Sequence, residues 1–212
     1  MLKSSAIVLA IYLVLALLVT YPLVVQLDTH VPGRGVDDPA LAWNLWWVKY
    51  SLFNLGANPL STDYLFYPLG INLVSFTATW LNAVIALPVQ LTFGVIIANN
   101  AVVIFALVVG GFGTFLLARE ILSRREIGPR DNRNTNLAAG LAGAFYAFGA
   151  WHINYVGAGH VNLLSNEWLP FYTLCLIRAH RATGVNGVLA GLFFGMTAWT
   201  EITFVPFLFI LS

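Results

Sequence analysis

The chain has 212 residues, of which 59% are apolar, and its mean hydropathy is +0.80. Only 9% of its residues are charged, against about 25% in an ordinary soluble domain. This composition predicts an integral membrane protein. The net charge of +1 provides no basic surface for nucleic acid, and the single cysteine, Cys175, excludes a disulfide framework.

Five apolar stretches have the length that a bilayer requires, which predicts an all-α fold with about five transmembrane helices. No internal repeat divides the chain, so residues 1–212 are expected to form a single transmembrane domain. The predicted order is span 1 within 1–25, an outer loop over 26–96, span 2 over 97–118, a cytoplasmic loop over 119–136, span 3 over 137–156, an outer loop over 157–162, span 4 over 163–178 and span 5 over 188–211.

Residues 76–95 are ambiguous, because they are apolar but also contain Asn82, Pro88 and Gln90. If this segment does not cross the bilayer, only Arg34 and Lys49 among the basic residues lie outside, as the positive-inside rule favours. The segment is therefore expected to form interfacial or re-entrant helices, and the N-terminus is expected to be cytoplasmic. The basic residues then placed inside are Lys3, Arg119, Arg124, Arg125, Arg130, Arg133, Arg178 and Arg181.

Two adjacent acids, Asp37 and Asp38, follow the first span in a chain that has few charges. Asp38 followed by proline is a strong helix start, and Gly56 is the expected end of that helix. A capping role would explain Asp38 but not Asp37. Such carboxylates could bind a divalent cation or act as a general base. The aromatic residues on one face of the helix, which favour an interfacial position, are Trp43, Trp46, Trp47 and Tyr50.

A second outer segment, residues 151–170, is unusually polar for this chain and includes His160, Asn162 and Glu167. These residues either belong to an ordinary loop or face a ligand next to the membrane. Glu201 lies within the last apolar stretch, where a carboxylate is either a functional group or a polar contact to another helix.

Several segments together resemble the opening of GT-C glycosyltransferases, a group that includes the oligosaccharyltransferase catalytic subunit and the protein O-mannosyltransferases. The resemblance extends over about residues 20–182. The segments that carry it are DDPALAWNLWW, NPLSTDYLFYPLGINL, AREIL, LAAGLAGAFYAF and HVNLLSNEWLPFYTLCLIR.

The resemblance implies a multi-pass protein of the bacterial inner membrane that transfers sugar from a polyisoprenyl-phosphate donor at the outer face. It implies Asp37 and Asp38 as catalytic residues, and Asp38 with Glu167 as ligands of Mg²⁺ or Mn²⁺. The expected substrate-binding residues are Arg34, His160, Asn162 and Glu167. Because family members have more spans, the chain is expected to be an N-terminal portion. The alternatives are a non-catalytic membrane subunit that binds other subunits and, with less support, a transporter.

Overall fold

The computed structural model describes residues 2–74, 76–124, 132–181 and 184–211. It confirms the all-α fold, because the extended structure described is one antiparallel pairing of β1 (Ser61–Thr62) with β2 (Ile71–Asn72). In this pairing Ser61 lies opposite Asn72 and Thr62 opposite Ile71. The pairing closes the irregular segment that follows the first outer helix.

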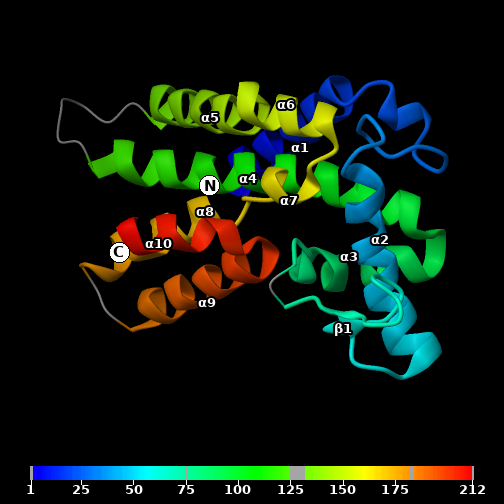
Figure 1. Cartoon of the computed structure of the whole chain (residues 1–212). Coiled ribbons are helices and arrows are strands. Elements are labelled where there is room, and N and C mark those ends of the chain that lie inside the picture. Colours follow the sequence, from blue (N-terminus) through cyan, green and yellow to red (C-terminus); the bar gives the residue numbers. More distant parts are fainter. Residues whose placement is uncertain (1, 75, 125–131, 182–183, 212) are drawn as a thin grey trace.

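The centre of the fold is α4 (Val95–Arg124), a helix of 30 residues. It contacts α1 (Leu2–Val19), α2 (Asp38–Tyr50), α3 (Trp80–Phe93), α5 (Asn132–Phe148), α7 (Val161–Leu164) and α8 (Leu169–Ala179). Figure 1 shows α5 and α6 (Ala150–Ala158) along one side of α4, and α8, α9 (Val185–Thr200) and α10 (Val205–Leu211) along the other. Glycines near the midpoint of α4 allow side chains of neighbouring helices to pack closely against its backbone. At Gly113, for example, an added Cβ would lie only 2.6 Å from the Phe171 ring. Within the described residues, α4 alone is long and apolar enough to cross a membrane.

The first helix, α1 (Leu2–Val19), packs against α4 and α5 (Asn132–Phe148). Tyr12 lies at this junction, fully buried, and its hydroxyl donates to the Gly140 carbonyl over 2.7 Å. The Tyr12 ring also meets the Phe148 ring edge to face at 6.2 Å. Close packing of the three helices therefore depends on one large side chain inserted between small residues.

The expectation of five long membrane-spanning helices is not supported. The first stretch ends at Val19, because Pro22 disfavours helix at the residue before it and is followed by the short η1 (Leu23–Val25). The third is divided by Gly149, whose extended backbone separates α5 from α6 (Ala150–Ala158).

The last two stretches are divided as well. Residues 165–168 separate α7 (Val161–Leu164) from α8 (Leu169–Ala179), and Pro170 is the second residue of α8. An extended residue, Glu201, ends α9 (Val185–Thr200), and η3 (Ile202–Phe204) and α10 (Val205–Leu211) follow it. The apolar pattern identified the stretches but not the breaks within them.

The helix after the acidic pair has the predicted extent. It runs as α2 (Asp38–Tyr50), continues through a π-helical turn η2 (Ser51–Leu55) and ends at Gly56 in the left-handed conformation, with φ of 61°. Its aromatic residues stack in pairs, with Trp43 on Trp47 at 5.6 Å and Trp46 on Tyr50 at 4.6 Å. The four rings form one continuous aromatic face.

The ambiguous segment contains α3 (Trp80–Phe93), which includes Pro88 and turns at Gly94 directly into α4. Helix α3 contacts α2, α4 and α9. Figure 1 shows α3 beside α2, at the end of α4 opposite to Arg124. The Asn44 amide donates to the Thr77 carbonyl over 2.7 Å, which joins α2 to the segment before α3. Helices α2 and α3 thus form one unit over the end of α4 where the two acids lie.

Candidate functional site

The two polar outer segments meet at a contact between the side chains of Asp37 and His160. The His160 Nε2 lies 2.9 Å from the Asp37 Oδ2, and the side chains are 30% and 60% exposed respectively. The imidazole also stacks on Tyr155, with ring centroids 5.7 Å apart. The structure thus brings Asp37 and His160, one residue from each predicted segment, into contact.

Local backbone geometry places His160 at this position. Helix α6 ends at Gly159, which has φ of +73°, a conformation that L side chains rarely adopt. A Cβ at Gly159 would lie 2.5 Å from the Asp38 Cβ and 2.5 Å from the Pro32 carbonyl oxygen. Only glycine lets the end of α6 approach the start of α2 so closely, and His160 follows directly.

Asp38, unlike Asp37, uses its side chain to hold the preceding loop. Its side chain is buried, and its Oδ1 accepts hydrogen bonds from the Gly35 amide at 2.8 Å and the Val36 amide at 3.0 Å. The expected N-cap role is corrected, because Asp38 is the first helical residue and its carboxylate binds the preceding loop. The N-cap position belongs to Asp37, whose side chain makes no capping bond and reaches His160 instead.

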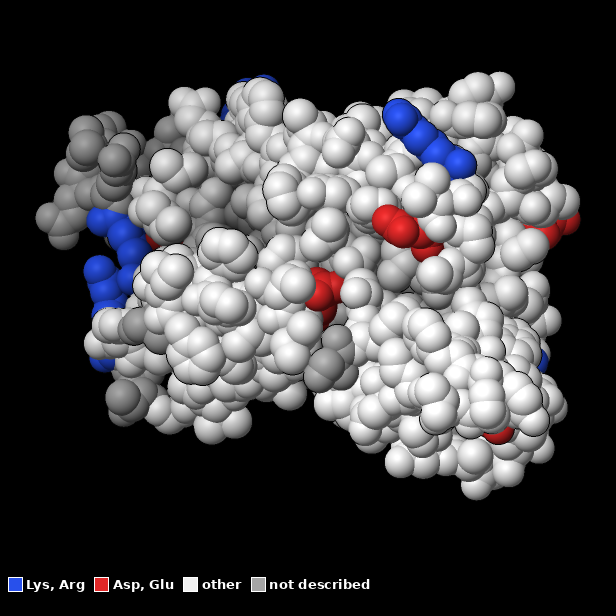
Figure 2. All heavy atoms as spheres, in the orientation of Figure 1, with Lys and Arg blue, Asp and Glu red and all other residues white. Residues whose placement is uncertain are grey.

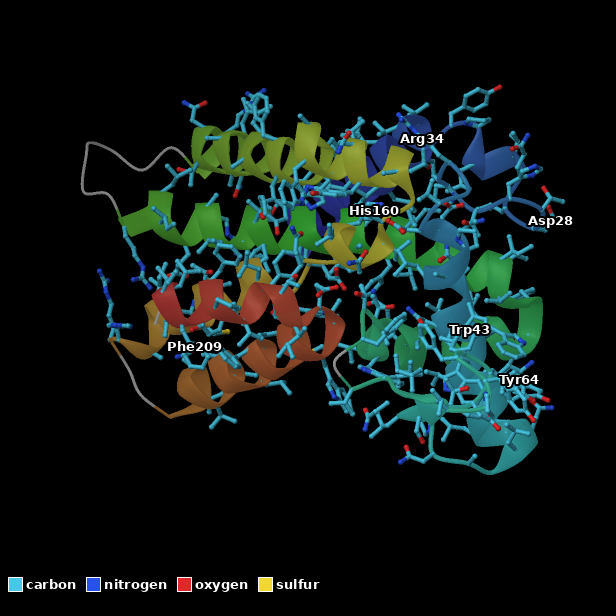
Figure 3. All side chains as sticks on the ribbon, viewed as in Figure 1. Asp28, Arg34, Trp43, Tyr64, His160 and Phe209 are labelled. Carbon is cyan, nitrogen blue, oxygen red and sulfur yellow. The ribbon has the colours of Figure 1, made fainter. Side chains whose placement is uncertain are left out.

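Arg34 is exposed and lies on the same face of the molecule as His160, whereas Asp28 lies apart at the edge (Figure 3). Figure 2 shows a basic side chain and an acidic group near each other on this face. His30, a further residue of the loop, is exposed and its Nδ1 lies 2.9 Å from the Thr29 hydroxyl. The charged groups near the pair are thus of both signs.

A cavity of about 380 Å³ lies near this contact, although neither Asp37 nor His160 lines it. Its walls are residues 19–23, 26 and 30–33 together with Ile153, Val156 and Gly157 of α6. Gly33 connects the cavity to the start of α2, because it lines the cavity and packs against the Asp38 side chain. The lining is largely apolar, with polar contributions from Thr20, Gln26 and His30.

Two expected binding residues make other contacts. The Asn162 amide donates to the Glu201 Oε2 over 3.0 Å, and both side chains are buried. Glu167 is fully buried, and its Cα lies 3.4 Å from the position of a Cβ at Gly110, at the middle of α4. Neither carboxylate oxygen of Glu167 has a hydrogen-bond partner within the part of the chain that the structure describes. The expectation that these two residues line the outer site is therefore corrected.

The expected metal ligands do not form a site together. Asp38 uses its Oδ1 to bind loop amides, and Glu167 packs against Gly110. The described ranges also contain no group of three His, Cys, Asp or Glu side chains with metal-binding geometry. Asp38 and Glu167 thus contact different parts of the chain, and no step below is assigned to a metal.

A buried polar network in the interior was not predicted. Tyr146 donates to the Asn166 Oδ1 over 2.8 Å, and the His152 Nε2 lies 2.9 Å from the same oxygen. The Asn82 amide of α3 donates to the Ser165 hydroxyl over 2.8 Å. The polarity of residues 151–170 indicated that some of these side chains need hydrogen-bond partners. The partners were not predicted, because they belong to helices that are distant in the sequence.

No protein-family model, no curated protein and no solved structure matches this chain. The function must therefore be inferred from the residues that the fold brings together. An exposed carboxylate held by an imidazole beside an apolar cavity can remove a proton from a bound hydroxyl or amine. It can also orient such a group without reacting.

Proposed function

We propose that this chain is the N-terminal part of a GT-C-type membrane glycosyltransferase in which Asp37 is the general base. The observation that supports this role most directly is the 2.9 Å contact between Asp37 and His160. The contact joins the two outer segments beside a cavity that could hold part of a substrate. Asp38 and Gly159 position the pair and do not touch the reacting atoms.

Membrane insertion is supported by large apolar side chains on the outside of several helices. Examples are Leu18 of α1 at 66% exposed, Phe145 of α5 at 77% and Ile210 of α10 at 81%. Exposure of so much apolar surface to water would be unfavourable, whereas lipid would cover it. In the proposed layout five segments cross the membrane, namely α1, α4, α5 with α6, α7 with α8, and α9 with α10.

Interrupted helices fit this layout only if their free backbone groups have partners within the protein. At the break in the last segment, the Glu201 Oε1 accepts a hydrogen bond from the Thr203 amide over 3.1 Å. The same carboxylate accepts from Asn162 of another segment. This carboxylate therefore stabilises the break and also connects two of the proposed crossing segments.

The orientation follows from the charges at the two ends of α4. Figure 2 shows several Lys and Arg side chains gathered at one end of the molecule, whereas most of the visible acidic groups lie nearer the other end. Arg119, Arg124 and Arg178 lie at the basic end, where Glu120 binds two of them. Arg125 and Arg130, which the sequence also placed there, lie outside the described residues. The positive-inside rule then makes this end cytoplasmic and the Asp37 end external.

The proposed reaction transfers a sugar from a polyisoprenyl phosphate to an acceptor hydroxyl. The acceptor oxygen forms a bond to the anomeric carbon while the bond from that carbon to the phosphate oxygen breaks. The hydroxyl proton passes to the Asp37 carboxylate, and the lipid phosphate leaves with the electron pair. His160 holds the carboxylate in place, and Arg34 supplies positive charge for the phosphate.

The test uses the protein in detergent with polyprenyl phosphate that carries a radiolabelled hexose and with an acceptor alcohol, and it measures transfer of the label from the lipid to the acceptor. Removing a general base costs about 10²–10⁴ in rate, so Asp37→Asn should lose that factor. The matched control is Asp28→Asn, which removes an exposed acid of the same segment away from His160. Equal activity in Asp37→Asn and Asp28→Asn would show that Asp37 is not the base.

Topology is tested with single cysteines in a Cys175→Ala background, which removes the one thiol of the sequence. The exposed residues Val36 and Ser123 are suitable positions at the two ends. A membrane-impermeant thiol reagent should label Val36→Cys from outside intact cells and Ser123→Cys only after permeabilisation. The opposite pattern would place Asp37 in the cytoplasm and contradict the proposed reaction.

The alternative of a non-catalytic membrane subunit is favoured by one observation, the exposed apolar face of α10. Its residues include Phe207 at 61% exposed and Phe209 at 67%, the latter labelled in Figure 3. A partner subunit could cover this face. Cysteines on this face that cross-link to a separate membrane protein, together with no transfer by the wild-type chain, would favour the subunit.

A further inference from the structure

A second cavity lies at the opposite end of the molecule from the Asp37–His160 pair, and the proposed function does not use it. Its volume is about 530 Å³, and four helices line it. Helix α4 contributes Arg119, Glu120 and Ser123, and α8 contributes Arg178. Helix α1 contributes Ser4, and the first turns of α5 contribute Thr135 and Asn136. This cavity is called the basic pocket below.

The charges around the basic pocket do not cancel. Of the residues that the structure describes, Glu120 is the one acid that lines it, and its Oε1 binds Arg124 at 2.6 Å while its Oε2 binds Arg178 at 2.6 Å. Arg119 has no carboxylate partner among the described residues, and its guanidinium lies 5.4 Å above the centre of the Phe115 ring. In the described ranges, the lining groups Arg119, Glu120 and Arg178 carry a net charge of +1, and Arg124, which binds Glu120, raises it to +2.

The pocket also contains unused polar groups. Within the described ranges, the side chains of Thr135 and Asn136 form no hydrogen bond, although both line the same cavity as Arg119. Ser123 differs, because its hydroxyl already donates to the Glu120 carbonyl over 3.0 Å. A hydroxyl and an amide can both donate, so the pocket offers neutral donors beside a free guanidinium.

This combination selects for a particular ligand chemistry. An anion with several oxygens can accept from Arg119, Thr135 and Asn136 at once, which a halide cannot do. Tetrahedral phosphate meets this requirement, and guanidinium groups bind phosphate oxygens in a bidentate manner. Basic pockets between the ends of membrane helices commonly bind phosphate head groups of lipids.

We propose that the basic pocket binds a phosphate group through Arg119, Thr135 and Asn136. The phosphate could belong to the head group of an anionic lipid or to a soluble ion. The proposal does not depend on glycosyl transfer, because the basic pocket and the Asp37–His160 pair share no residue and lie at opposite ends of α4.

The experiment titrates the purified chain in neutral detergent with phosphatidylglycerol, with phosphatidylcholine as the zwitterionic lipid, and with inorganic phosphate. Binding is measured as ligand-induced thermal stabilisation, and lipids retained are counted by native mass spectrometry. A response to phosphatidylglycerol alone would identify a lipid as the source of the phosphate. A response to inorganic phosphate as well would show that the phosphate group is sufficient.

Three variants connect the response to the pocket. Arg119→Gln removes charge-assisted hydrogen bonds and should weaken binding about 10- to 100-fold. Thr135→Val removes one neutral hydrogen bond without changing charge and should weaken binding about 2- to 10-fold. The matched control is Arg181→Gln, an exposed arginine that follows α8 and does not line the pocket. This variant should change binding less than about twofold.

Two results would overturn the proposal. The first is the absence of saturable binding with both phosphatidylglycerol and inorganic phosphate. The second is an equal loss in Arg119→Gln and Arg181→Gln, since that pattern indicates general attraction to a basic surface. If Arg119→Gln does not elute as the wild type does on size exclusion, Thr135→Val decides the question, and unchanged binding in Thr135→Val would refute the pocket.

Discussion

Replacement of Asp38 by alanine should destabilise the protein, whereas replacement by asparagine should be tolerated. Both loop amides donate to the same oxygen, Oδ1, at 2.8 Å from Gly35 and 3.0 Å from Val36. A hydrogen bond to a charged group contributes about 1.5–3 kcal/mol. Because Gly35 and Val36 are exposed, water can partly replace the lost acceptor, and we expect Asp38→Ala to cost about 2–4 kcal/mol in total.

Asparagine retains an Oδ1 that can accept from both amides, so Asp38→Asn loses only the charge assistance and should cost about 1 kcal/mol. The free energy of unfolding can be measured by titration with sodium dodecyl sulfate in mixed micelles, and sugar transfer can be measured on the same samples. Asp37→Asn is the comparison, because its exposed pair with His160 contributes about 0–1 kcal/mol to stability.

Two results would refute this reasoning. If Asp38→Asn unfolds as easily as Asp38→Ala, the negative charge and not the Oδ1 acceptor stabilises the loop. If Asp38→Asn has wild-type stability but no transfer activity, Asp38 takes part in the reaction directly. Normal transfer in Asp38→Asn together with loss in Asp37→Asn would establish that the two acids have different roles.

Two further predictions concern glycines that have matched controls in the same helix or at its end. Gly159→Ala should lower the free energy of unfolding by about 2–4 kcal/mol, because Gly159 has φ of +73° and an added Cβ would meet Asp38. The control is Gly157→Ala, where an added Cβ has no atom within 4 Å. This variant should be neutral or stabilising by up to about 1 kcal/mol. Gly143→Ala should lower the free energy of unfolding by about 1–3 kcal/mol, because the added Cβ would overlap the Tyr12 hydroxyl. The control is Gly140→Ala, because a Cβ added at Gly140 would meet no atom within 4 Å. Unfolding in mixed micelles distinguishes the members of each pair, and equal effects within a pair would contradict the close packing described here.

The sequence was sufficient to predict the elements whose causes are local. The helix that begins at the acidic pair and ends at Gly56 was predicted because proline at the second helical residue and glycine at the end act within one turn. The all-α fold was predicted because long apolar runs dominate the composition. The breaks at Gly149 and Glu201 were missed, since hydropathy averaged over a window does not detect one residue with extended backbone.

The contacts of the polar residues could not be predicted, because their partners are distant in the sequence. Glu167 and His160 belong to the same polar segment, yet His160 reaches Asp37 and Glu167 packs against Gly110. The chain between them forms α7, a helix of one turn, and then enters the interior. The residue types indicated chemistry in this segment, but only the tertiary fold separates the exposed group from the buried one.

The different positions of the adjacent acids follow from the geometry of a helix start. Successive side chains in a helix point about 100° apart. Two adjacent residues at a helix start therefore cannot both face the same surroundings. Gly159 packs against Asp38 so closely that no side chain would fit at Gly159. This packing buries the Asp38 carboxylate, which accepts hydrogen bonds from the loop amides. Asp37 must then point outward, where His160 is the group that the turn at Gly159 brings within 2.9 Å. A side chain at Gly159 would therefore disturb the proposed base as well as the loop, and Gly159→Ala should reduce transfer more than its loss of stability explains.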